Sequence, residues 1–163
     1  MCLVKVLTCC VVVSAHPAVA DPFSNMTGSW NGSGWARQSP QGPKETVRCR
    51  ITNTYDVATN TLAVAGRCAV PGRKLTMSGT LNGKDGAERI TGRWSNPDGI
   101  GSAGIVGIQR GNIVAFNFSA IDPETGRNLS QNVEWRISGD TLLLRSTDRT
   151  NPTVAMSKIE FAR

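Results

Sequence analysis

The stretch from Glu45 to Val70, ETVRCRITNTYDVATNTLAVAGRCAV, decides which fold the chain is expected to adopt. Apolar and polar residues alternate in both halves, which is the period-two pattern of strands that bury one face. Val57–Asn60 is typical of a turn between them. If the residues flanking that turn pair, Cys49 lies directly opposite Cys68 and both apolar sets share one face. The stretch therefore predicts a β-hairpin closed by a Cys49–Cys68 disulfide.

The same alternation recurs along the rest of the chain. Turn-forming Gly, Pro, Asn and Asp recur about every eight to twelve residues, and no helical periodicity exceeds two turns. The sequence predicts an all-β fold, an antiparallel up-and-down β-barrel of about eight to ten strands, with a meander or sandwich as alternatives. The expected strands are Gly28–Arg37, Glu45–Asp56, Thr61–Val70, Lys74–Leu81, Glu88–Ser95, Ala103–Gln109, Asn112–Ser119, Asn128–Ser138, Thr141–Ser146 and Val154–Phe161.

Glycines favour a barrel over a flat sandwich. We expect Lys74–Leu81 and Glu88–Ser95 to pair so that Leu75 faces Trp94 and Gly79 faces Ile90. A glycine opposite a bulky residue lets a strongly bent sheet close without a clash.

The first twenty residues, MCLVKVLTCCVVVSAHPAVA, resemble a secretory signal peptide. An apolar run of ten residues follows Lys5 and is too short to span a bilayer, and Ala18-Val19-Ala20 fits an A-x-A cleavage site. We expect cleavage after Ala20, a single β-barrel domain over 21–163, and a periplasmic or secreted protein. A short buried helix is the alternative. In an oxidising compartment the two remaining cysteines, Cys49 and Cys68, are expected to be bonded rather than free.

Composition limits the chemistry. The only histidine of the 163 residues, His16, lies in the expected signal peptide, so the domain lacks histidine for a catalytic triad or a metal site. The acidic residues fall mostly in turn-like contexts, and no spacing makes two carboxylates converge. We therefore expect no enzyme, no metal and no cofactor.

The tripeptide Gly28-Ser29-Trp30 resembles the signature of the calycin superfamily: lipocalins, avidins and bacterial metalloprotease inhibitors. The resemblance implies a barrel whose closed end is plugged by the tryptophan, with a late arginine stacked over it. The inhibitors are similar in layout from Gly28 to Leu81, since they too join neighbouring strands by a disulfide. The segment Asp21–Asn25, expected to be extended, stands where such inhibitors carry a protease-blocking arm. Candidates for the stacking arginine are Arg145, Arg149 and Arg163.

Arginine on the expected outer face is the first candidate site. The alternation points Arg48 and Arg50 outward and puts Arg50 across from Arg67, where like charges repel. Guanidinium groups bind phosphate or carboxylate, so the pattern indicates an anionic partner. The alternative is a solubilising face whose arginine stems cover apolar surface. The predicted anion site comprises Arg48, Arg50, Arg67, Arg89 and Arg93.

The barrel interior is the second candidate site. Glycines on the inner face, such as Gly66, Gly79, Gly92 and Gly107, leave space for a small apolar ligand, whereas a core filled by its own side chains is the alternative. Asn117 is expected to add a polar group. The predicted cavity residues are Trp30, Met77, Trp94, Phe116, Gln131 and Trp135.

These features predict an exported, non-enzymatic binding protein of the cell envelope. Its partner is an anionic envelope or host component or an acidic protein, or a small ligand in the barrel. Nucleic acid is not expected, since no row of exposed aromatic residues is available for base stacking. The alternative is an inhibitor of a secreted hydrolase or protease.

Overall fold

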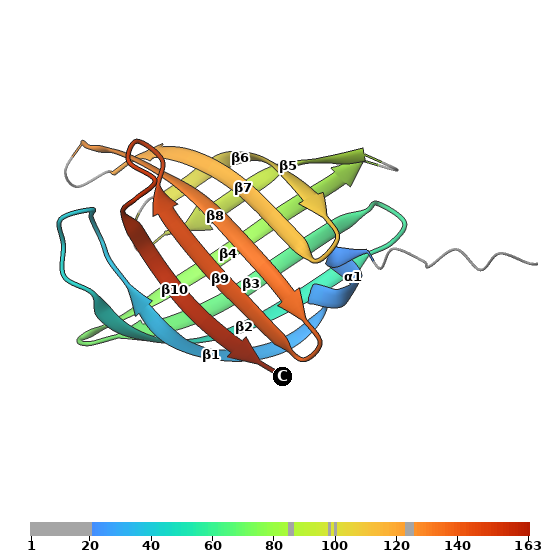
Figure 1. The fold of residues 1–163 in the computed structure, drawn as a ribbon, viewed down its shortest axis with the longest axis horizontal. Helices are drawn as coiled ribbons and strands as arrows, with labels where there is room; N and C mark the ends of the chain where they lie inside the picture. Colours follow the sequence, from blue (N-terminus) through green and yellow to red (C-terminus); the bar gives the residue numbers. More distant parts are fainter. Residues whose placement is uncertain (1–20, 85–86, 98, 100, 123–125) are drawn as a thin grey trace, which may run out of the picture.

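The chain closes into an antiparallel up-and-down β-barrel (Figure 1). The computed structural model describes residues 21–84, 87–97, 99, 101–122 and 126–163. Within them, one short helix precedes ten strands, each paired with its predecessor, and β10 closes on β1. The elements are α1 (Pro22–Met26), β1 (Gly28–Ala36), β2 (Glu45–Asp56), β3 (Thr61–Val70), β4 (Arg73–Lys84), β5 (Ala87–Asn96), β6 (Gly101–Arg110), β7 (Ile113–Ile121), β8 (Asn128–Ser138), β9 (Thr141–Asp148) and β10 (Ala155–Ala162).

The β2–β3 hairpin confirms the predicted register. Cys49 pairs with Cys68 and the two form a disulfide, with their Cα atoms 4.0 Å apart. Val47, Cys49 and Ile51 are buried, whereas the arginines between them are exposed. The strand alternation therefore fixes which side chains of this hairpin face the barrel interior.

The β4–β5 hairpin corrects the predicted register. Gly79 pairs with Trp94 and Leu81 with Gly92, a shift of four residues from the expected pairing. The loop is shorter than expected because β4 extends to Lys84 and β5 begins at Ala87, with an irregularity next to Gly83. An even shift leaves every side chain on its expected face, because the period of a strand is two. Glycine still faces a bulky residue, but the partners differ.

Two other predictions about individual segments are wrong. Asp21–Asn25 is not extended, since most of it lies in α1. Asn117 does not face the interior: it pairs with Asn132 on the outer face, between the buried Phe116 and Phe118. Several strands also run one to three residues beyond their expected ends, because pairing with a neighbour extends a strand past its apolar run.

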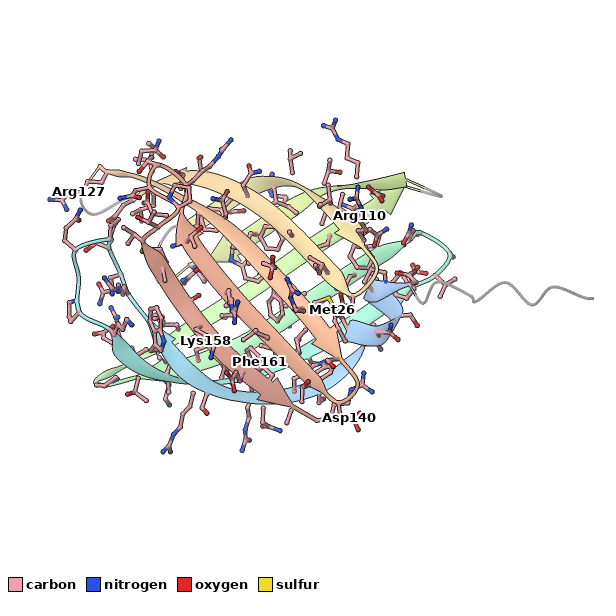
Figure 2. The ribbon with its side chains drawn as sticks, viewed as in Figure 1. Met26, Arg110, Arg127, Asp140, Lys158 and Phe161 are labelled. Atoms are coloured by element: carbon pink, nitrogen blue, oxygen red, sulfur yellow. A yellow bond between two sulfur atoms is a disulfide. The ribbon has the colours of Figure 1, made fainter. Side chains whose placement is uncertain are left out.

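The helix α1 closes one end of the barrel, where Figure 2 labels Met26. Asp21 caps it by accepting a hydrogen bond from the Phe23 amide at 2.9 Å. Phe23 and Met26 are fully buried. The indole of Trp30 donates to the Met26 carbonyl at 2.8 Å, and the amide of Asn53 donates to the same oxygen at 3.0 Å. These two hydrogen bonds satisfy the Met26 carbonyl at the end of the helix, which would destabilise the fold if it were buried without a partner.

Arg163 covers the same end from outside. Its guanidinium lies 4.5 Å from the centre of the Trp30 ring and donates to the Asn25 carbonyl at 2.7 Å. Of the three arginines offered by the sequence resemblance, Arg163 is the one that stacks on this tryptophan. A cation–π contact of this kind contributes about 0.5–1 kcal/mol at an exposed position.

Replacing both Cys49 and Cys68 with alanine is expected to lower the free energy of unfolding by about 3 kcal/mol. The bond restricts a loop of 19 residues in the unfolded chain, which gives a value of that size in the chain-entropy model. Urea unfolding followed by circular dichroism measures it. The wild type should become as unstable as the variant when a reductant is added, and the variant should be insensitive to it. Equal stability with and without the disulfide contradicts the expectation.

Gly79→Ala tests the corrected β4–β5 register. A Cβ atom at Gly79 would lie 2.5 Å from the Trp94 ring, so the substitution is expected to cost about 1–3 kcal/mol. Gly104→Ala is the control, since nothing lies within 4 Å of its added Cβ. In a double-mutant cycle, Trp94→Leu should relieve part of the cost of Gly79→Ala. Additive effects of the two substitutions would place Gly79 away from Trp94.

Candidate functional site

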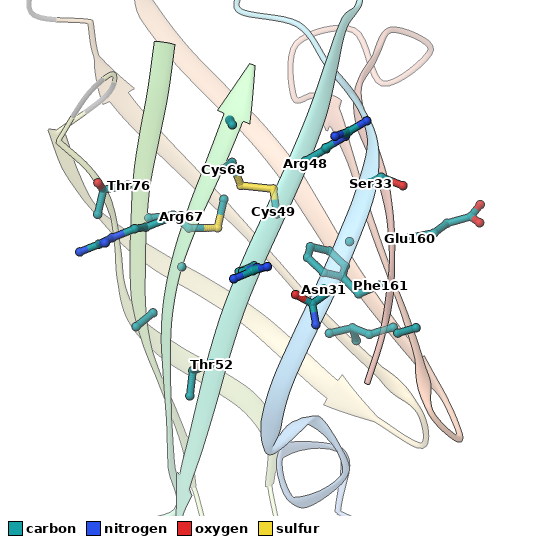
Figure 3. Close-up of a pocket in the computed structure, with 18 of the residues that line it drawn as sticks. Asn31, Ser33, Arg48, Cys49, Thr52, Arg67, Cys68, Thr76, Glu160 and Phe161 are labelled. Carbon is teal, nitrogen blue, oxygen red and sulfur yellow. A yellow bond between two sulfur atoms is a disulfide. The ribbon is translucent and has the colours of Figure 1, made fainter. Parts of the chain in front are cut away.

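A basic groove runs across the outer face of the barrel from β9 and β10 over β1 to β4 (Figure 3). We call "basic groove" the surface formed by the exposed cations Arg48, Arg50, Arg67 and Lys74 with the polar side chains around them. Figure 3 shows the disulfide crossing between β2 and β3, and Arg48 and Arg67 projecting from these two strands. The uncharged polar side chains of the groove are Asn31, Ser33, Thr52, Thr76, Ser78 and Thr141, and Glu160 lies on β10, next to the β9 edge.

The groove is organised as rows of side chains that the strand register aligns. Arg50 pairs with Asn31 of β1 and Arg67 of β3, and Arg67 pairs in turn with Thr76 of β4. Because the neighbouring Cys49–Cys68 pair is closely spaced, Arg50–Arg67 is the wider hydrogen-bonded pair, whose Cα atoms are about 5.5 Å apart. The Arg50 and Arg67 side chains therefore start from directly opposed positions on the outer face of adjacent strands.

Glycines form part of the floor of the groove, and the interior side chains close it from below. A Cβ atom at Gly32 would lie 2.3 Å from the Phe161 ring, and one at Gly66 would lie 2.6 Å from Ile51. Bulky inner side chains thus occupy the space under both glycines. The groove is a surface feature and not an entrance to the barrel at these two positions.

Carboxylates do not neutralise the centre of the groove. Glu160 is the only acidic side chain among the described lining residues, and it is paired with Lys158 at 2.7 Å. That hydrogen bond lowers the pKa of Glu160, with a smaller contribution from the charge of Lys158. Within the described part of the chain, none of the four ion pairs involves Arg48, Arg50 or Arg67.

The structure brings three of the five predicted arginines together and separates the other two. Arg93 of β5 pairs with Thr80 and donates to the Ser102 hydroxyl at 3.3 Å. Arg89 lies farther along β5, opposite the exposed Ile108. Neither residue lines the basic groove.

Sequence reasoning missed Lys74 and Asn31 as members of the groove. Lys74 pairs with Ala69 across the short Pro71-Gly72 turn, so a register for this hairpin would have placed it beside the arginines. The position of Asn31 could not be predicted in this way, because a loop of eight residues separates β1 from β2 and their pairing register does not follow from the sequence.

The predicted cavity residues all belong to the inner side of the barrel, where Trp30, Trp94, Phe116 and Trp135 are part of the buried core. Trp94 lies 5.5 Å from Phe116 between ring centres, and Trp135 lies 5.9 Å from Phe161. Trp30 contacts the end of α1, Met77 and Gln131 are half-buried, and Gln131 pairs with Asp148. Neighbouring groups also occupy the space at the glycines that were expected to leave room, namely Gly66, Gly79, Gly92 and Gly107.

Three polar atoms of inward-facing side chains lack a partner among the described residues: Oδ1 of Asn53, Oε1 of Gln109 and Nε1 of Trp135. The indole nitrogen of Trp135 is fully buried, and the side-chain oxygen of Gln109 is buried as well. Both residues pair with Val114, one on each side, so they lie in one row across β6, β7 and β8. A donor and an acceptor left unpaired in a core each carry a desolvation cost.

Most carboxylates of the described residues accept hydrogen bonds within turns or form ion pairs. Asp148 accepts hydrogen bonds from Thr150 and Asn151, and the Thr150 side-chain bond lowers the pKa of Asp148. The Thr59 hydroxyl has the same effect on the pKa of Asp56. The carboxylates in ion pairs are Glu45 with Arg73, Glu88 with Arg110, Glu134 with Arg136 and Glu160 with Lys158.

The fold and the groove together describe the protein as a closed ten-stranded β-barrel with one disulfide and a cluster of exposed cations on the outer face above it. No protein-family model matches the chain, and no curated protein matches it. No helix in the described part of the chain is long and apolar enough to cross a membrane. No three His, Cys, Asp or Glu side chains gather into a metal-binding group among the described residues.

Arg50→Gln is expected to stabilise the unliganded protein by about 0.2–1 kcal/mol at low salt, because it removes one of two like charges in a cross-strand pair. Urea unfolding in buffer without phosphate or sulfate measures the change. The gain should disappear in about 1 M NaCl, where exposed charges are screened. Arg93→Gln is the matched control and should not stabilise. A destabilised Arg50→Gln would contradict the repulsion.

Proposed function

We propose that the protein is an exported, non-enzymatic binding protein that recognises an anionic group on an envelope or host molecule through the basic groove. The observation that supports this proposal most directly is the Arg50–Arg67 cross-strand pair. Arg48 and Lys74 lie in the neighbouring row, and no carboxylate lies between these four cations among the lining residues. A protein gains nothing in stability from facing two guanidinium groups, whereas an anion between them forms charge-assisted bidentate hydrogen bonds.

The outer groove supports this function better than the barrel interior does. Inner aromatic side chains contact one another, and the inner glycines are covered by neighbouring groups. A small ligand in the barrel would have to displace these packed contacts, at a cost in stability. The groove cations are exposed and need no rearrangement before they contact a ligand.

Export is supported by the disulfide. Disulfide bonds form and persist in oxidising compartments and are rare in the cytosol. The expected signal peptide, residues 1–20, lies outside the described residues. A periplasmic or secreted location is therefore part of the proposal and rests on the sequence pattern together with the Cys49–Cys68 bond.

The absence of enzymatic activity is also part of the proposal. Hydrogen bonds from neighbouring side chains lower the pKa of Asp56, Glu88, Asp148 and Glu160, which favours the charged form of these carboxylates. A general acid needs the opposite environment, one that raises its pKa toward the working pH.

The alternative function, inhibition of a secreted hydrolase or protease, rests on the resemblance to calycin barrels. The Trp30–Arg163 stack and the helix that closes one barrel end fit that resemblance. A closed barrel alone does not define a family, so the resemblance stays a proposal. The segment that would act as an inhibitory arm is folded against the barrel, with Phe23 buried. This placement favours the basic groove over the inhibitor.

Reversing both charges, Arg50→Glu with Arg67→Glu, is expected to weaken binding to heparin and to vesicles of anionic phospholipid on the order of 100-fold. Each hydrogen bond between charged groups contributes about 1.5–3 kcal/mol, and the reversed charges also repel the ligand. Heparin-column retention and vesicle co-sedimentation measure the loss, and circular dichroism checks that the variant folds.

The matched control is Arg89→Glu with Arg93→Glu, which makes the same change in net charge outside the groove. This control should retain most of the binding, because salt screens its distant charges. Equal losses in both variants would mean that net charge, rather than the groove, is responsible. Unchanged binding in the groove variant together with inhibition of a protease by the wild type would favour the alternative.

A further inference from the structure

The spacing and charge of the Arg50–Arg67 pair restrict the kind of anion that the basic groove can hold. The pair lies at the centre of the groove, with Asn31 beside Arg50 and Arg48 one row away. Lys74 extends from β4 in the same row as Arg48, so four cations surround a floor of small residues. The four cations occupy two neighbouring outward-facing rows on three adjacent strands. A patch limited to two rows meets one small, highly charged group, or only a short part of an extended polyanion.

On the basis of the proposed function, we infer that the Arg50–Arg67 pair binds the dianionic form of a phosphomonoester. A monoester carries a charge of about −1.5 to −2 at pH 7 and presents three terminal oxygens. It can therefore accept bidentate hydrogen bonds from one guanidinium and a further bond from the other, and its charge compensates both. Asn31, which pairs with Arg50, and Arg48 and Lys74, in the neighbouring row, are the further polar and cationic residues of the groove around this pair.

Other anions match this arrangement less well. A carboxylate or a phosphodiester carries a single negative charge and offers two terminal oxygens, so one of the two guanidinium groups keeps an uncompensated charge. The residual repulsion across the pair opposes binding. The groove therefore distinguishes a monoester from a diester by charge and by the number of acceptors.

The preference for a dianion predicts a pH dependence that comes from the ligand. The second pKa of a phosphomonoester is about 6, so its charge doubles between about pH 5 and pH 7.5. The charged groups that face the site are Arg48 and Arg50 on β2, Arg67 on β3, Lys74 on β4 and Glu160 on β10. The hydrogen bond from Lys158 lowers the pKa of Glu160, which keeps that carboxylate ionised over this range. Residues 21–163 contain no histidine to titrate there.

Calorimetric titration with methyl phosphate, dimethyl phosphate and acetate tests the inference. Methyl phosphate should bind about tenfold more tightly at pH 7.5 than at pH 5, following its second ionisation. Dimethyl phosphate and acetate should bind at least about tenfold more weakly than methyl phosphate at pH 7.5, without that pH dependence. Binding of both methyl and dimethyl phosphate with equal affinity, or a flat pH profile for methyl phosphate, would overturn the assignment.

Three variants separate the site from the rest of the surface. Arg50→Gln with Arg67→Gln should abolish the difference between methyl and dimethyl phosphate, while Arg89→Gln with Arg93→Gln should preserve it. Arg50→Lys with Arg67→Lys keeps the charge and removes the bidentate fork, so it should bind methyl phosphate several-fold more weakly than the wild type does. If the variant with both glutamines bound methyl phosphate as tightly as the wild type does, the assignment of the site to Arg50 and Arg67 would be wrong.

Vesicles distinguish the source of the phosphate. Phosphatidic acid carries a monoester headgroup and phosphatidylglycerol a diester. Selective binding to phosphatidic acid vesicles together with binding of methyl phosphate assigns the phosphate group itself as the ligand. Selective binding to the vesicles alone assigns a lipid headgroup. If heparin binding depends on Arg50 and Arg67 but no monoester is preferred, the phosphomonoester assignment fails and the proposed function stands.

Discussion

The pairing of Cys49 with Cys68 is the contact on which the geometry of this protein depends. The disulfide holds β2 against β3 in one register, and a strand alternates its side chains with a period of two. Once the two sulfur atoms lie inside the barrel, the residues on either side of them must point outward. Arg48, Arg50 and Arg67 are exposed for that reason. A slip of one residue between the two strands would bury either Arg48 and Arg50 on β2 or Arg67 on β3.

Glycines have different structural roles on the inner and the outer face of the barrel. Inside, glycines leave space that neighbouring aromatic rings fill: the Trp94 ring packs against Gly79 and the Phe161 ring against Gly32. This complementarity lets the sheet bend into a closed shape without steric clashes. Outside, the backbone of Gly32 lines the basic groove between the outward side chains of Asn31 and Ser33. One small residue thus contributes to both the core packing and the floor of the basic groove.

Particular segments show why sequence reasoning succeeded in one hairpin and failed in the next. The short turn between β2 and β3 leaves one register that brings the cysteines together, so the pairing followed from the residues. Between β4 and β5 no covalent bond marks the register, and four residues of the expected loop extend the strands instead. The helix Pro22–Met26 was missed because a five-residue segment carries too little periodicity to detect. Its stability comes from burial of Phe23 and Met26 in the barrel end, which is a tertiary contact.

The sequence by itself determined the all-β class, the antiparallel order of the strands, the disulfide and the outward direction of the arginines, because these follow from local alternation and short turns. Only the tertiary structure decided which of the arginines share a surface. Closure of the barrel places β10 and its Glu160 beside β1, and the register of β3 with β4 adds Lys74 to the groove, while it leaves Arg89 and Arg93 apart. Pairing between strands depends on loop lengths and on packing across the whole barrel, and local sequence does not encode these quantities.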